Sequence, residues 1–173
     1  MRTSTSIGIA AVSLAAVLGG TLATGSAVVA SATPTGSNDR GRATVLHLTA
    51  ETDQFAVIDV GSPGPALGLG DQIVSSDRIT RDGKPTGRGG TVLTVVGAGP
   101  AALTTQVVTT LDLHDGQIVL HGIGDGPTGP PTEPITFTLA ITGGTGSYKN
   151  ARGFAEIIDR PGGTETLTIR LTR

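Results

Sequence analysis

Glycine and proline recur along this chain at intervals too short to leave room for a long helix. The 173 residues include 27 glycines and 10 prolines, and both residue types destabilise the interior of a helix. Between them lie short runs rich in Val, Ile, Thr and Leu, a pattern typical of strands separated by turns. The sequence therefore predicts an all-β domain, arranged as an antiparallel sandwich or barrel.

Nine runs are expected to form strands. A barrel of eight antiparallel strands needs one fewer, so we expect one run to be a loop or to belong to a bent neighbour. Two Gly/Pro-rich stretches, 61–70 and 124–134, are expected to be loops. The predicted strands are Ala43–Ala50, Phe55–Val60, Gln72–Thr80, Gly90–Val96, Leu103–Leu113, Gln117–Ile123, Ile135–Thr142, Gly153–Ile158 and Glu165–Thr172.

The dipeptide Asp115-Gly116 predicts a hairpin with a two-residue turn. That turn would pair His114 with Gln117. One face of the hairpin would be apolar and the other polar, and the last strand repeats this alternation with Leu or Ile against Thr or Arg. A closed barrel would turn the apolar faces inward and leave no strand edge unpaired. The apolar hairpin face comprises Leu111, Leu113, Ile118 and Leu120.

The first 32 residues have the pattern of a secretory signal peptide. Arg2 is their one charged residue, an interrupted apolar run follows, and Ala30-Ser31-Ala32 resembles a cleavage site. The apolar run is too short for a typical spanning helix, although a membrane anchor is the alternative. We therefore expect a signal peptide at 1–32, a flexible lead-in at 33–42, a barrel domain at 43–173, and a secreted mature protein.

Composition excludes several kinds of site. Without cysteine, the chain has no disulfide and no thiolate nucleophile or metal ligand. Aromatic residues make up 2% of the chain and the formal net charge is −2, so neither base stacking nor a basic nucleic-acid or membrane surface is expected. We expect no cofactor and no metal, although Asp112, His114 and His121 on one polar hairpin face are a weak alternative as metal ligands.

Two segments carry a family resemblance. The first runs from Leu67 through Gly70-Asp71 to Thr86-Gly87, and the second contains Gly143-Gly144-Thr145-Gly146-Ser147-Tyr148, followed by Ala151-Arg152-Gly153. Together they resemble the allene oxide cyclase and dirigent superfamily over residues 44–172. The resemblance implies an eight-stranded antiparallel barrel with an apolar lumen, cofactor-free work on a small hydrophobic molecule, and a homo-oligomer, since plant members are often trimers.

The sequence departs from both plant patterns of this superfamily. The catalytic Glu and Asn of the plant cyclases fall at Leu48 and Ala50, although a register slip would bring Glu51 into place. Their cysteine falls at Thr91, and the dirigent arginine falls at Phe137. The resemblance therefore supports neither the plant oxylipin reaction nor phenol coupling.

Two acids remain as candidate catalytic residues. Asp77 falls where the cyclases place a water-positioning Asn and dirigent proteins an aspartate, and Asp125 falls at a second dirigent acid. If both point into the mouth of an apolar barrel, desolvation would raise their pKa values and suit them to proton transfer. Alternatively, Asp77 is a solvated strand residue and Asp125 a turn residue.

Two functions follow from these residues. The first is a secreted, cofactor-independent cyclase or isomerase that folds an aliphatic or polyene molecule in its lumen, with Asp77 and Asp125 as acid or base. The second is a secreted binding or dirigent-like scaffold barrel without chemistry. A lumen large enough for a ligand favours the first, and an interior filled by side chains favours the second.

Overall fold

The computed structural model describes residues 44–61, 66–129 and 131–172. The predicted signal peptide at 1–32 and lead-in at 33–42 lie outside these residues, and the loop predicted at 61–70 is described only in part. No helix in the described ranges has the length and apolar character needed to cross a membrane.

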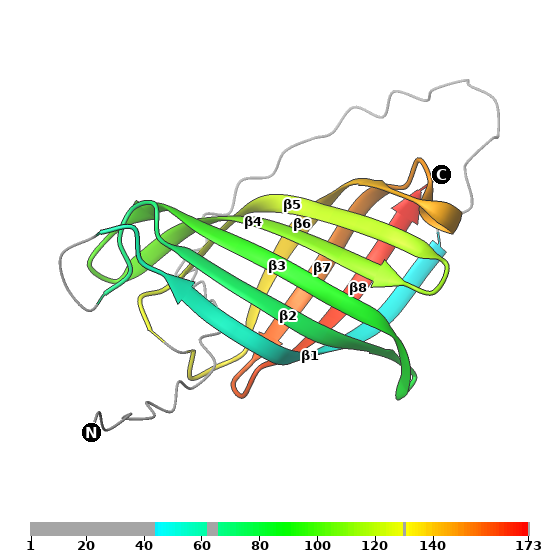
Figure 1. Cartoon of the computed structure of the whole chain (residues 1–173), viewed down its shortest axis with the longest axis horizontal. Helices are drawn as coiled ribbons and strands as arrows, with labels where there is room; N and C mark the ends of the chain where they lie inside the picture. The colour runs from blue at the N-terminus through cyan, green and yellow to red at the C-terminus, as the bar shows by residue number, and fades with distance from the viewer. Residues whose placement is uncertain (1–43, 62–65, 130, 173) are drawn as a thin grey trace, which may run out of the picture.

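Eight antiparallel strands pair in chain order and close into one barrel, as predicted (Figure 1). In the part of the chain that the structure describes, the one helical element is a short 3-10 turn, η1 (Gly146–Tyr148), so the expectation of an all-β fold is confirmed. The strands are β1 (Thr44–Ile58), β2 (Gln72–Arg81), β3 (Lys84–Ala98), β4 (Ala102–Leu113), β5 (Gly116–Pro127), β6 (Ile135–Gly144), β7 (Arg152–Arg160) and β8 (Thr164–Thr172).

The ninth predicted strand is part of a bent neighbour. Residues 43–50 and 55–60 were expected as separate strands, yet β1 runs through both and shifts register between Thr52 and Gln54. A bulge of this kind bends a strand without ending it. The predicted loop at 124–134 also begins later than expected, because β5 continues to Pro127 and pairs there with Ala102.

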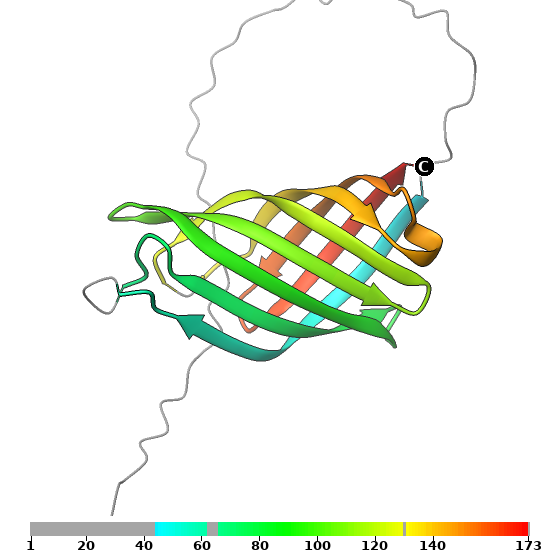
Figure 2. The ribbon, with the colours of Figure 1, turned by 45° about the horizontal axis from the view of Figure 1, so that its top comes forward.

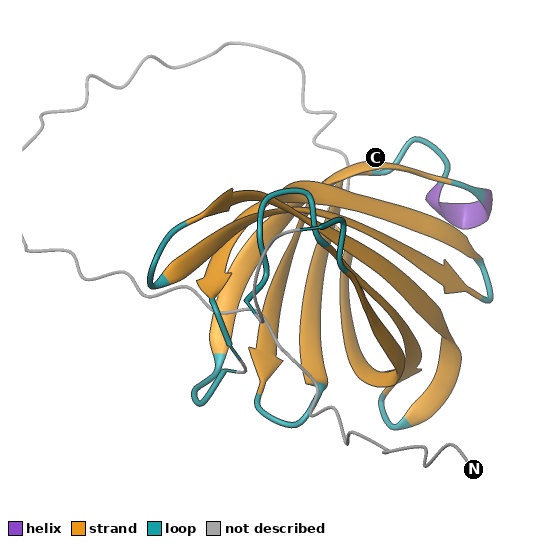
Figure 3. Ribbon diagram, turned by 60° about the vertical axis from the view of Figure 1, so that its left-hand side comes forward, coloured by secondary structure: helices purple, strands orange, loops and turns teal. Residues whose placement is uncertain are grey.

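The barrel has two ends of different construction (Figures 1 and 2). At one end, here called the turn end, lie the β2–β3, β4–β5 and β6–β7 connections, with η1 and the start of β1 beside the end of β8. At the other, here called the loop end, lie the β1–β2, β3–β4, β5–β6 and β7–β8 connections. Figure 3 brings the loop end forward and shows its longer irregular segments.

The predicted register of the β4–β5 hairpin is wrong, although its faces are right. Leu113 pairs with Gly116 and Asp112 with Gln117, so the two-residue turn is His114-Asp115. Gly116 belongs to the strand, has φ +136°, and lies so close to the Thr145 carbonyl that a Cβ there would clash with it. The new register differs from the predicted one by two residues, which preserves the side-chain alternation. The apolar face is therefore buried as expected.

An aliphatic core fills the turn half of the barrel. Leu120, Leu139 and Ile169 are fully buried, and Tyr148 from η1 joins the same cluster. Burial of such side chains is the main source of stability in a barrel of this size. The core comprises Leu46, Leu48, Ala50, Ile79, Val107, Leu111, Leu113, Ile118, Leu120, Leu139, Ile141, Tyr148, Ala151, Ala155, Ile157, Leu167, Ile169 and Leu171.

Candidate functional site

Of the two predicted acids, Asp77 faces the interior and Asp125 does not. Asp77 is 8% exposed and pairs with Gly89 of β3, and its inward neighbours along β2 are Ile73 and Ile79. Asp125 is exposed on the outer face of β5, where its carboxylate accepts a hydrogen bond from Thr104 Oγ1 at 2.7 Å. The condition that both acids point into the barrel mouth is therefore met by Asp77 and not by Asp125.

Two other acids join Asp77 on the inner wall. Glu165 begins the inward row of β8 and pairs with Asp159 of β7 on one side and with Ala50 of β1 on the other. Asp159 is 2% exposed. Asp77 pairs with Thr52, the next inward residue of β1 after Ala50. Strands β7, β8, β1 and β2 therefore carry the acid set Asp159, Glu165 and Asp77 on one stretch of wall toward the loop end.

Sequence reasoning missed Glu165 and Asp159, although a signal was present. The predicted inward row of the last strand is Leu167, Ile169 and Leu171, and one more step back by two residues reaches Glu165. The same step from Ala155 and Ile157 along β7 reaches Asp159. Both acids stand at strand ends beside the Arg160–Gly163 turn, where charged residues normally belong to the solvent.

The barrel wall raises the pKa of Glu165. The side chain keeps some exposed surface, but protein atoms surround its carboxyl group closely. Desolvation by this burial, and then the neighbouring charges of Asp159 and Asp77, raise the pKa of Glu165 from 4.5 to about 8. Glu165 is therefore an uncharged carboxylic acid at neutral pH.

Asp77 has a different balance of forces. Desolvation by burial raises its pKa, while a hydrogen bond from the Thr52 hydroxyl opposes the rise. Such a hydrogen bond favours the charged form of a carboxylate. Gly89 leaves room for this carboxylate, because a Cβ on Gly89 would lie 3.2 Å from Asp77 Oδ2. Desolvation is the larger of the two effects, so the pKa of Asp77 lies above its ordinary value.

Hydroxyl groups continue the polar lining of the interior. Ser75, Thr91 and Thr109 pair in one row across β2, β3 and β4, and the hydroxyls of Thr91 and Thr109 lie 3.0 Å apart. Thr105 lies fully buried farther along β4 and donates to the carbonyl of Gly124 at 3.2 Å. The loop half thus has a partly polar inner surface, in contrast to the aliphatic turn half.

The inner wall of the loop half is filled unevenly. Phe55, Ser75, Thr91 and Phe137 keep some exposed surface, whereas Ile73, Val95 and Leu103 are as deeply buried as the core of the turn half. A hollow of about 280 Å³ lies along β1 and β2, lined by Gln54, Phe55, Ala56, Val74, Ser75 and Ser76. Phe55 and Ser75 face inward, but the other four lie in the outward-facing rows, so this hollow opens on the outer side of the wall.

The positions that correspond to the plant catalytic residues hold other residue types in this chain. Leu48 and Ala50 face inward and are buried in the aliphatic core. Glu51 points outward, where its carboxylate lies 3.8 Å from Arg78 on an exposed surface, so no register slip brings it inside. Phe137 faces inward against the core. The acids of this barrel therefore come from β2, β7 and β8, and the first strand contributes none to the interior.

The glycine-rich signature turn has a structural role at the turn end. A Cβ on Gly144 would lie 2.5 Å from the Gln117 carbonyl oxygen. The Thr145 N–H donates to the same carbonyl at 2.9 Å, and the Ser147 N–H donates to Asp115 at 2.7 Å. This turn therefore docks on the β4–β5 hairpin and closes that end of the barrel.

Asp71 of the other motif fastens a loop. Its carboxylate accepts hydrogen bonds from the N–H groups of Val60 at 2.9 Å and Gly68 at 2.8 Å. The hydrogen bonds from Gly68 and Val60 lower the pKa of Asp71, because they favour its charged form. Asp71 thus holds both flanks of the β1–β2 connection at the loop end.

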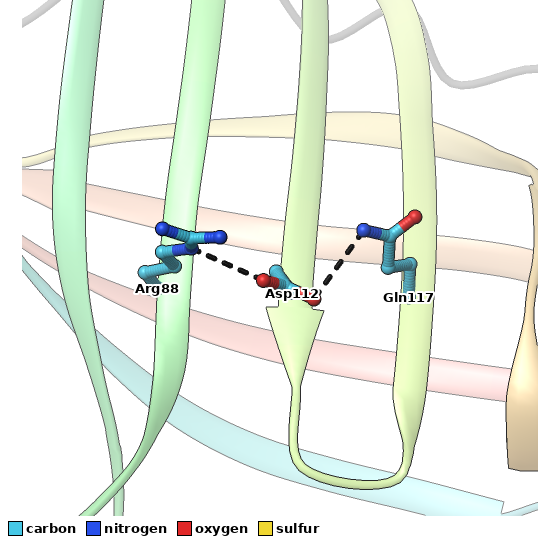
Figure 4. A network of polar contacts seen from close by, with 3 residues as sticks. All are labelled: Arg88, Asp112 and Gln117. Atoms are coloured by element: carbon cyan, nitrogen blue, oxygen red, sulfur yellow. Dashed lines mark hydrogen bonds and ion pairs between the residues drawn. The ribbon is translucent and has the colours of Figure 1, made fainter.

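The polar outer face of the β4–β5 hairpin is a hydrogen-bonded surface. Asp112 accepts from Arg88 Nε at 3.1 Å and from Gln117 Nε2 at 3.3 Å (Figure 4). His121 Nε2 lies 2.9 Å from Gln106 Nε2, and His114 is exposed. No group of three or more potential metal ligands occurs within the described residues, so nothing there supports the alternative of a metal site.

Solved structures show the same barrel in proteins of several activities. The chain is 28% identical to a structure named pyocyanin demethylase, covering 73% of this chain and 99% of that one with a TM-score of 0.60. The pterocarpan synthase dirigent protein PsPTS1 is 21% identical, with coverages of 76% and 96% and a TM-score of 0.56. The Diels-Alderase AbmU from Streptomyces koyangensis is 17% identical, with coverages of 76% and 64% and a TM-score of 0.58.

A family model gives the assignment. The comparison with curated proteins finds no significant match. The model described as "Allene oxide cyclase barrel like domain" matches residues 44–171, which include all eight strands of the barrel except the last residue of β8. With the closed eight-stranded topology and the signature turn in its expected place, this match shows that the chain belongs to the allene oxide cyclase barrel-like family.

Proposed function

We propose that this protein is a secreted, cofactor-independent isomerase or cyclase that acts on a small hydrophobic molecule in the loop half of its lumen. Export rests on the signal-like pattern of residues 1–32. The observation that carries the catalytic part is Glu165, a carboxylic acid that stays protonated at neutral pH on the inner wall beside a second acid. Two carboxyl groups with different environments can divide the roles of acid and base.

In this proposal Glu165 is the general acid and Asp77 is the general base. The Glu165 O–H donates its proton to a substrate carbonyl oxygen, and Asp77 takes a proton from the neighbouring carbon. The substrate gains one proton and loses one, so the product is an isomer and no oxidant or reductant is consumed. The aliphatic core of the turn half would border the site and hold the substrate in one conformation, which lowers the entropic part of the activation barrier.

The substrate is best sought with a panel that starts from the relatives. The name of the demethylase structure makes pyocyanin the first compound to test, and polyene chains follow from the aliphatic lining. Mass spectrometry after incubation separates the possibilities. An isomer or ring-closed product keeps the mass of the substrate, whereas demethylation lowers it.

Variants of the two acids test the assignment once a substrate is found. Glu165→Gln and Asp77→Asn are expected to lower turnover by roughly 100-fold or more, which is the usual contribution of a positioned acid or base. Glu156→Gln is the matched control, because Glu156 is exposed on the outer face of β7. Full turnover by both acid variants would refute the acid–base roles, and a ligand that binds and returns unchanged would favour the scaffold function.

A further inference from the structure

An uncharged patch lies on the outer face of four neighbouring strands, β1 to β4 (Figure 1). Its middle row is aliphatic: Val92 and Val108 are 39% and 40% exposed, Ala56 is exposed and Val74 is half-buried. The row on either side consists of amide, hydroxyl, aliphatic and glycine residues, and none of the three rows contains a charged residue. The flanking rows are Gln54, Ser76, Gly90 and Thr110 toward the turn end, and Ile58, Gln72, Thr94 and Gln106 toward the loop end.

Charged residues border this patch and are common elsewhere on the outer wall. Toward the turn end, Arg78 lies 3.8 Å from Glu51 and Arg88 lies 3.1 Å from Asp112, so these border charges are already paired within the chain. The exposed outward residues of β7 and β8, by contrast, include Arg152, Glu156 and Arg170. Absence of charge from one patch of an otherwise charged surface is typical of the centre of a protein–protein interface.

The patch is hollow over two of its strands and raised over the other two. The hollow of about 280 Å³ lies over β1 and β2, where Ala56 and Val74 contribute to its lining. It lies directly after the register shift of β1, and a bulge of this kind bends a strand. On β3 and β4, Val92 and Val108 pair with each other and stay exposed. One patch therefore carries both an apolar hollow and a pair of apolar side chains of a size to enter one.

We infer that a second copy of this chain covers the patch, with Val92 and Val108 of one copy over the hollow of the other. Assemblies of identical chains need surfaces that complement one another, and the hollow and the valine pair meet this need. The flanking Gln, Ser and Thr side chains both donate and accept hydrogen bonds, so they can pair with their own kind. A second copy also brings no unpaired charge onto the patch.

The size of the patch fits this partner. With a rim of one residue on every side, four strands cover roughly 700 Å² of sheet, which is close to the about 800 Å² per partner of a standard interface. The patch lies on the outer wall, so its role does not depend on the chemistry proposed for the interior.

Analytical ultracentrifugation of the purified protein over a range of concentrations tests whether copies associate through this patch. We expect a mass of at least two chains. Val92→Asp and Val108→Asp would each place a charge at the centre of the interface, and we expect each to raise the dissociation constant by about 100-fold or more. Val45→Asp is the matched control, because Val45 is 38% exposed on the outer face of β1 and lies outside the patch. A single chain at every concentration would overturn the inference, and so would an assembly that both patch variants leave intact.

A labelling experiment gives a second test that introduces no charge. The chain has no cysteine, so Val92→Cys and Val45→Cys each carry a single thiol at outward positions of nearly equal exposure in one copy. We expect a water-soluble maleimide to label Val92→Cys roughly tenfold more slowly than Val45→Cys, because the second copy excludes the reagent. Equal labelling rates would overturn the inference, whether or not the protein proves to be an isomerase.

Discussion

The two halves of this barrel use the same alternating strands for different purposes. In the turn half, inward positions are Leu, Ile and Ala that are buried almost completely, and the signature turn docks on a hairpin to close that end. In the loop half, the same inward rows continue into Asp77, Asp159, Glu165 and a row of hydroxyls. Apart from local register shifts such as the one in β1 between Thr52 and Gln54, the strands run on from one half into the other, so the change from core to site lies mainly in side-chain chemistry.

This contrast shows where stability and function are separated in the fold. The residues of the turn half contribute burial energy and hold the barrel closed. The acids of the loop half oppose folding when they are charged, because burial and mutual repulsion raise the free energy of their ionised forms. Stability from one half therefore allows an unfavourable arrangement in the other.

The largest expected effect comes from truncating the core of the turn half. Leu139 is fully buried, whereas Val57, at the loop end of β1, is 45% exposed. Leu139→Ala is expected to lower the free energy of unfolding by about 2–5 kcal/mol, and Val57→Ala by less than about 1 kcal/mol. Denaturant unfolding of both variants measures this, and equal losses would show that the halves are not differently packed.

The next effect is a stability that falls as pH rises. The pKa of Glu165 is raised from 4.5 to about 8 in the folded protein. The group therefore makes its full contribution to stability below pH 4.5, and that contribution is lost as the pH rises to about 8. Asp77 acts in the same direction, since burial raises its pKa too. Glu165→Gln should remove most of this fall and stabilise the protein above pH 8, on the order of a few kcal/mol. If thermal unfolding shows that the variant and the wild type lose equal stability across this pH range, the prediction is wrong.

A smaller effect is expected from the glycine under Asp77. Gly89→Ala would place a methyl group 3.2 Å from the Asp77 carboxylate and 3.4 Å from Ile79, which forces a shift of a few tenths of an ångström. We expect a loss of about 1 kcal/mol in unfolding free energy at most, measured by denaturant unfolding, together with a loss of turnover once a substrate is found. Full turnover by this variant would separate Asp77 from the site.

Acid should loosen the loop end through Asp71. The lowered pKa of Asp71 means that its stabilising hydrogen bonds are present above its unfolded-state pKa and are lost as pH falls through the folded-state value. At neutral pH, limited proteolysis should therefore cut the β1–β2 connection of Asp71→Asn about as readily as it cuts that of the wild-type protein at low pH. Unchanged cleavage in the variant at neutral pH would argue against this role.

The smallest effect is expected at Asp125. Its carboxylate is exposed on the outer face and bonds Thr104 there. Exposed hydrogen bonds of this kind contribute little to stability, so Asp125→Asn should leave stability and turnover within experimental error. A large loss of turnover would show that the outer surface of β5 takes part in function.

The sequence was sufficient for the architecture because its signals are local. Gly/Pro spacing and strand alternation predicted an antiparallel sandwich or barrel, and the family resemblance, carried in part by the motif at 143–146, implied the eight-stranded barrel. The β4–β5 turn lies one residue earlier than predicted, at His114-Asp115. Gly116 instead packs in the strand against the carbonyl of Thr145, a residue far along the chain, where a side chain would clash. Local turn chemistry carries no information about such a contact.

The site was only partly predictable for a similar reason. Asp77 was found from a family position, and its inward placement agrees with that expectation. Asp125 was misplaced because the strand continues through the expected loop and alternation turns the side chain outward. Glu165 and Asp159 lie on opposite sides of one hairpin turn, and only the register of β7 and β8 brings them together on the inner wall.

The most direct test of the account is the titration of Glu165 itself. Carbon NMR of the protein labelled at glutamate side-chain carboxyls, assigned with Glu165→Gln, reports the pKa of this group without any substrate. The account predicts a midpoint near pH 8, lowered in Asp77→Asn because one repelling charge is gone. A midpoint near the ordinary glutamate value of about 4.3 would contradict the central claim that the loop half holds a protonated acid at neutral pH.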